Sequence, residues 1–88
     1  MQNKIKHNST CGKFERSDCL VSIEPYDTLK IEINSKVKKL FGKEIEKTIR
    51  KVIKENNIEK IYVKIDDYGA LDWVIRARLE CALQRASV

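Results

Sequence analysis

The 88-residue chain has few of the residues that mark common catalytic and metal sites. It holds one histidine, His7, and only three glycines, with no glycine-rich phosphate loop and no nucleophile placed near a base. Its cysteines, Cys11, Cys19 and Cys81, are widely spaced and form no C-x-x-C pair, so they do not follow a zinc pattern. The sequence therefore favours a non-catalytic binding or carrier role without a metal site.

Long apolar runs are also missing from the chain. No segment approaches the roughly 20 apolar residues that cross a membrane. The first ten residues, MQNKIKHNST, lack the apolar core of a secretory signal. We therefore expect a cytoplasmic protein without a membrane partner, whose thiols stay free because that compartment is reducing.

The length allows one domain with a compact core. Apolar residues make up 42% of the chain and charged residues 35%, a mixture typical of a folded soluble domain. Residues 1–12 are polar and lack periodicity, so we expect a flexible amino-terminal arm. Residues 13–88 are expected to form the single folded domain.

Hydrophobic periodicity predicts five elements in that domain. Strands are expected at residues 14–23, 29–34 and 60–66, and helices at residues 36–54 and 70–87. The first two strands are expected to pair antiparallel. Because a helix joins the second strand to the third, those two are expected to be parallel, with both helices on one face. The predicted fold class is α+β, a two-layer sandwich in the order strand-strand-helix-strand-helix, with a small three-stranded mixed sheet and two helices packed on one face.

The net charge of +5 comes from one segment, because residues 36–60 hold nine Lys or Arg against four Glu. A lysine stripe of this kind could neutralise the phosphates of a nucleic acid. However, aromatic residues are only 7% of the chain, and no exposed pair that stacks on bases can be identified. A solvated helix face that touches an acidic partner is favoured, and a small basic nucleic-acid-binding module remains an alternative.

Three further features have both a structural and a functional explanation. Asp66 and Asp67 could hold a hard cation, but neighbours on a strand point to opposite faces and aspartate before a helix is typical of a cap. Trp73 is expected at the edge of the core. Ser17, within GKFERSDCLVSIEP, is either an ordinary loop residue or an exposed hydroxyl open to a modifying enzyme.

Four stretches occur together in a specific order: CGKFERSD, the IEP turn, LKIEINSKVKKLFGKEIEKTI and VKIDDYGALDWVIRARLECALQRA. From Gly12 onward the chain resembles the acyl carrier (gamma) chain of citrate lyase. The resemblance implies a cytoplasmic carrier whose serine bears 2'-(5''-phosphoribosyl)-3'-dephospho-coenzyme A, attached by a prosthetic-group transferase through a phosphodiester. It also implies that the arm's thiol carries acetyl, that the transferase (alpha) chain exchanges acetyl for citryl, and that the lyase (beta) chain releases oxaloacetate during citrate fermentation.

The attachment segment departs from the family pattern of glycine, threonine, leucine, glutamate, serine, serine or glycine, and aspartate. Here Arg16 occupies the usual serine position, and Ser17 matches a position where many members have a second serine, so Ser17 is the predicted acceptor. A one-residue shift turns a strand side chain to the opposite face, whereas a loop tolerates it. Arg16 could also hold the phosphates of the arm. The alternatives are the carrier of malonate decarboxylase, which uses the same arm, and an unloaded structural homologue.

Overall fold

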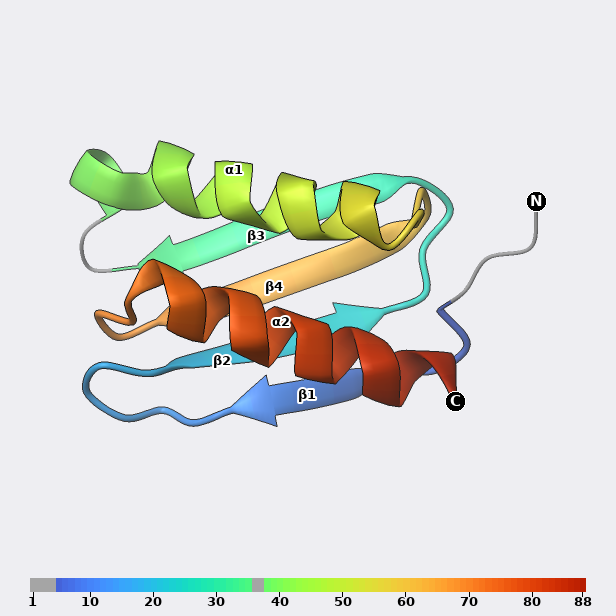
Figure 1. The fold of residues 1–88 in the computed structure, drawn as a ribbon, viewed down its shortest axis with the longest axis horizontal. Coiled ribbons are helices and arrows are strands. Elements are labelled where there is room, and N and C mark those ends of the chain that lie inside the picture. The colour runs from blue at the N-terminus through green and yellow to red at the C-terminus, as the bar shows by residue number, and fades with distance from the viewer. Residues whose placement is uncertain (1–4, 36–37) are drawn as a thin grey trace.

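A computed structural model of the chain describes residues 5–35 and 38–88. A β-sheet forms one layer and two helices cover one of its faces (Figure 1). The elements are β1 (Ser9–Gly12), β2 (Cys19–Glu24), β3 (Leu29–Ser35), α1 (Lys38–Glu55), β4 (Ile61–Asp67) and α2 (Asp72–Ser87). The predicted α+β class with both helices on one face is confirmed, but the sheet has four strands rather than three.

The additional strand, β1, lies in the segment expected to be a flexible arm. Ile5 is buried, and the amide of Lys6 donates to the carbonyl of Ala86 over 2.8 Å. Ser9 Oγ donates to the carbonyl of Ala82 over 2.6 Å, which joins β1 to α2. The arm prediction is therefore wrong for residues 5–12. The four-residue edge strand buries only Cys11, which is too few residues for an alternating pattern to appear in the sequence.

The strands lie in the order β1-β2-β4-β3. β3 and β4 are parallel, as predicted, and β2 pairs antiparallel with β1 and β4. The predicted direct pairing of the first two strands is wrong, because β4 lies between β2 and β3. The physical reason is burial: Ile61, Val63 and Ile65 of β4 are fully buried, so the most apolar strand takes a central place, while β3 keeps one exposed edge.

Both helices bury one apolar stripe against the sheet. In α1 the stripe consists of Ile45, Ile49, Val52 and Ile53, at the three- and four-residue spacing that the sequence predicts. In α2 the buried residues are Ile75, Leu79, Ala82, Leu83 and Ala86. Val37, which the sequence places on the first stripe, lies outside the described residues. The single core therefore lies between the sheet and the two helices.

None of the helices in the described ranges is both long and apolar enough to cross a bilayer.

Candidate functional site

The candidate site is the turn formed by residues 13–18, which joins β1 to β2. Figure 1 shows this turn at the same end of the sheet as the loop between β4 and α2. The side chains from Lys13 to Ser17 are all exposed, and Asp18 is half-buried. The segment is a turn and not a strand, so the alternation of faces along a strand does not apply to the shift from Arg16 to Ser17.

Backbone hydrogen bonds hold this turn in place. Lys13 N donates to Cys19 O over 3.1 Å, and Asp18 N donates to Glu15 O over 3.1 Å. Ser17 N donates to Tyr68 O over 2.9 Å, and Tyr68 N donates to Asp18 O over 3.0 Å. The last two bonds tie the turn to the end of β4, so the position of Ser17 is set by tertiary structure.

Ser17 adopts the left-handed backbone conformation, with φ of 65°. This region is uncommon for residues other than glycine, and such residues persist where surrounding contacts hold them. Ser17 Oγ makes no hydrogen bond to any residue in the described part of the chain. Its hydroxyl is therefore exposed and open to reaction, while its backbone is fixed on both sides.

Gly12, which ends β1, has φ of +114° and lets the chain enter this turn. A Cβ at this position would lie 1.9 Å from the carbonyl oxygen of Cys19. Both the backbone conformation and the close approach require glycine. The glycine of the GKFERSD stretch therefore has a structural role in placing Ser17.

Asp18 anchors the carboxyl end of the turn. Its Oδ1 accepts from the amide of Cys19 over 2.7 Å and from Arg78 Nε over 3.1 Å, and its Oδ2 accepts from Arg78 Nη2 over 2.7 Å. The Arg78 hydrogen bonds, followed by the Cys19 amide, lower the pKa of the Asp18 carboxyl. The sequence does not reveal this pair because its members are separated by 60 positions.

Aromatic side chains surround the turn. The rings of Phe14 and Tyr68 meet edge to face with centroids 5.7 Å apart. Trp73 is 68% exposed, so its predicted place at the edge of the core is wrong. The reason is helical geometry, because Trp73 lies two residues, about 200°, from Ile75, which faces the core.

A cavity of about 410 Å³ lies beside Ser17, against the side of α2 that carries Trp73 and Arg78. Cys11 and Cys81 also line it. Burial, followed by the neighbouring Cys81 thiol, raises the pKa of the Cys11 thiol. All three cysteines are free. Cys19 lies deeper, where burial raises its thiol pKa to about 12 and so disfavours the reactive thiolate.

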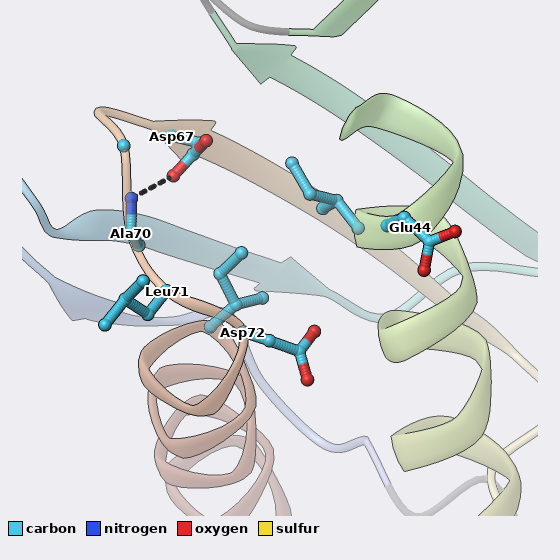
Figure 2. Close-up of a pocket in the computed structure, with 8 residues that line it drawn as sticks. Glu44, Asp67, Ala70, Leu71 and Asp72 are labelled. Carbon is cyan, nitrogen blue, oxygen red and sulfur yellow. Dashed lines mark hydrogen bonds between the residues drawn. The ribbon is translucent and has the colours of Figure 1, made fainter. Parts of the chain in front are cut away.

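A second hollow, of about 360 Å³, lies between the two helices and the β4–α2 loop (Figure 2). Asp67 is buried there, accepting from Ala70 N and from Ser35 Oγ over 2.9 Å each. The predicted helix cap is therefore wrong: Asp67 closes the loop, and the N-cap position of α2 is Leu71, which makes no side-chain cap hydrogen bond. Within residues 5–35 and 38–88, no three His, Cys, Asp or Glu side chains gather as a metal site.

Residues 6–86 match the family described as "ACP: Malonate decarboxylase delta subunit (MdcD)". The citrate lyase acyl carrier protein of Treponema denticola is 40% identical over 84 residues, covering 96% of this chain and 97% of that protein. The same-named protein of Haemophilus influenzae is 44% identical over 84 residues, covering 96% and 88%. That of Clostridium perfringens is 43% identical over 86 residues, covering 96% and 85%.

A solved structure shares the fold. A chain in the crystal structure of a Pseudomonas malonate decarboxylase hetero-tetramer in complex with malonate superposes with a TM-score of 0.82 at 20% identity. The match covers 93% of this chain and 86% of that chain. Together the fold and the turn define a small two-layer α+β domain that presents one serine on a hydrogen-bonded turn. The chain belongs to the acyl carrier family that includes the citrate lyase acyl carrier proteins.

Proposed function

We propose that this chain is the non-catalytic acyl carrier subunit of a citrate lyase and that Ser17 Oγ is the attachment point of its prosthetic arm. The observation that supports the attachment point most directly is the exposed Ser17 on a turn whose backbone is fixed by Tyr68 and Asp18. Identities of 40–44% to citrate lyase acyl carrier proteins, over 96% of the chain, support the carrier role.

The residues present fit a phosphodiester-linked group. Among the described residues none bonds Ser17 Oγ, so this oxygen is available to attack the phosphorus of an activated donor, with its proton passing to a base of the transferase and the donor's phosphate leaving group departing. Lys13 and Arg16 are exposed on the same turn and, among the described residues, form no ion pair, so both can face a phosphate. When bound, 2'-(5''-phosphoribosyl)-3'-dephospho-coenzyme A supplies a terminal thiol that carries an acyl group as a thioester.

The protein's contribution is to hold the attachment point still and to be recognised. A prosthetic-group transferase has to reach Ser17, and this residue is exposed on a turn that lies at one end of the sheet. We expect the alpha (transferase) and beta (lyase) subunits of citrate lyase to bind this carrier in the cytoplasm. A tether raises the effective concentration of the acyl group at both active sites without any catalytic residue of this chain.

The carrier of malonate decarboxylase is the second candidate, because the matching family carries that name and the Pseudomonas hetero-tetramer shares the fold. Partner chains separate the two. The loaded chain is expected to restore citrate cleavage to the alpha and beta subunits of the Haemophilus influenzae enzyme, and to leave malonate decarboxylase subunits inactive. Oxaloacetate release measures the first reaction, and carbon dioxide release measures the second.

Ser17→Ala is the matched variant for this assay. It is expected to abolish oxaloacetate release, while Ser22→Ala, altered at a half-buried serine of β2, keeps it. Equal activity of Ser17→Ala and the unaltered chain would contradict the proposal. Activity only with malonate decarboxylase subunits would reassign the chain to the second candidate.

A further inference from the structure

Trp73 is unusual in its exposure. It is the only tryptophan of the chain and is 68% exposed, although large aromatic side chains are on average well buried. It lies in the first turn of α2, on the side away from the core. An exposed indole offers a flat π surface to a ligand, and the residues around it indicate which kind of ligand could bind there.

Those neighbours include Ser17. Trp73 and Ser17 line the same cavity of about 410 Å³, which falls within the roughly 300–1,000 Å³ of small-molecule sites. Val74 and Ala77 of α2 add small apolar surface to its wall. A group tethered at Ser17 would therefore begin its path inside this cavity.

The charges around the cavity suit a nucleotide. Arg78 lines it and pairs with Asp18, which neutralises the carboxylate of the residue that follows Ser17. Lys13 and Arg16 add two cations on the exposed turn, against the single further acid Glu15. The surroundings of Ser17 thus favour phosphates, and the indole beside it favours a base.

We propose that this cavity holds the adenine of the prosthetic arm in the resting carrier, with Trp73 as the stacking surface. The inference rests on the proposed loading of Ser17. A base tethered at a lining residue has a local concentration of about millimolar or more, so contacts with a dissociation constant of about a millimolar or less keep it in the cavity. Stacking on Trp73 adds to these contacts, because the loss of one base–aromatic contact typically weakens binding by about fivefold or more. Holding the nucleotide leaves the thiol end of the arm to reach the partner subunits.

Fluorescence of Trp73 tests the proposal, because no second tryptophan contributes. Loaded and unloaded chains, distinguished by intact mass, are compared in the absence of partner subunits. We expect the loaded chain to show quenched emission and reduced collisional quenching by acrylamide, independent of protein concentration. Equal emission and quenching of the two forms would overturn the proposal while leaving the loading of Ser17 intact. A concentration-dependent difference, which indicates contact between molecules, would overturn it as well.

A second measurement does not depend on indole emission. The proton resonances of adenine in the loaded chain are expected to be shifted by the ring current of Trp73, and Trp73→Ala should return them to their positions in the free arm. Leu71→Ala, which removes a 63% exposed apolar side chain outside the cavity, is the matched control and should leave the shift unchanged. A shift that survives Trp73→Ala would overturn the proposal. Absence of any mass gain would instead contradict the proposed function.

Discussion

Arg76 and Arg78 lie two residues apart on α2, and each pairs with a carboxylate from a different part of the molecule. Arg78 binds Asp18 of the β1–β2 turn, whose side chain is 14% exposed, and that carboxylate also accepts a backbone amide. Arg76 binds Glu55 at the end of α1, whose side chain is 40% exposed. Arg78 therefore fixes the candidate site, whereas Arg76 joins the two helices at the surface.

The difference lies in the carboxylates. Both arginine side chains are similarly exposed, at 36% and 37%. Exposed ion pairs contribute little because water screens them and both side chains lose conformational freedom. Asp18 instead joins a strand end, a turn and a helix, so its loss would release several contacts at once.

The largest effect is expected for Gly12→Ala, which breaks the turn itself. The added Cβ would meet the Cys19 carbonyl oxygen, and alanine would be strained at φ of +114°. We expect the free energy of unfolding to fall by at least about 3 kcal/mol, measured by urea denaturation. Gly69→Ala is the matched control, because at φ of +90° it meets no atom within 4 Å and should lose only roughly 1–2 kcal/mol. Equal losses would contradict the packing argument.

Asp18→Ala should reduce loading of Ser17 while the domain remains folded. Without the anchor, the hydroxyl is no longer held in one position, and misplacement of about 1 Å can slow a reaction roughly a hundredfold. The loading rate is measured by intact mass over time with the prosthetic-group transferase, and folding by circular dichroism. Glu15→Ala, an exposed acid on the same turn, is the control and should load normally. An unchanged rate for Asp18→Ala would show that the anchor does not matter for loading.

The same anchor predicts a dependence on pH. The folded-state pKa of Asp18 lies below its ordinary value of 3.8, so its contribution is complete above about that value and is lost as the pH falls through the lower folded pKa. The stability difference between the unaltered chain and Asp18→Asn should therefore shrink on acidification below 3.8. Denaturation curves at a series of pH values measure it, and a difference that grows in acid would contradict the assignment.

Arg76→Ala sharpens the comparison because it should have the smallest effect. Its exposed pairs with Glu55 and Glu80 are expected to contribute little, so loading should be unchanged and the melting temperature only slightly lower. Arg78→Ala, measured in parallel, should slow loading as Asp18→Ala does. Equal effects of the two arginine variants on loading would remove the distinction drawn between them.

Much of the fold follows from periodicity, whereas the site depends on contacts between distant residues. Alternation predicts β4, and helical spacing predicts the buried faces of α1 and α2, because each pattern is carried within one segment. The order of the strands is not local: nothing between β2 and β3 reveals that β4 inserts between them. The family resemblance predicts Ser17 as the acceptor. The hydrogen bonds between the turn and Tyr68, and the anchoring of Asp18 by Arg78, join distant residues and are seen only in the structure.

The most direct test of the account is peptide mapping of the chain expressed together with citrate lyase maturation enzymes. Trypsin cuts after Arg16 and Lys30, so Ser17 and Ser22 fall in one peptide, and fragmentation separates them. We predict a mass gain of one phosphoribosyl-dephospho-coenzyme A unit on Ser17, absent in Ser17→Ala and kept in Ser22→Ala. An unmodified chain, in cells that load a control citrate lyase carrier, would contradict the account and indicate an unloaded structural homologue.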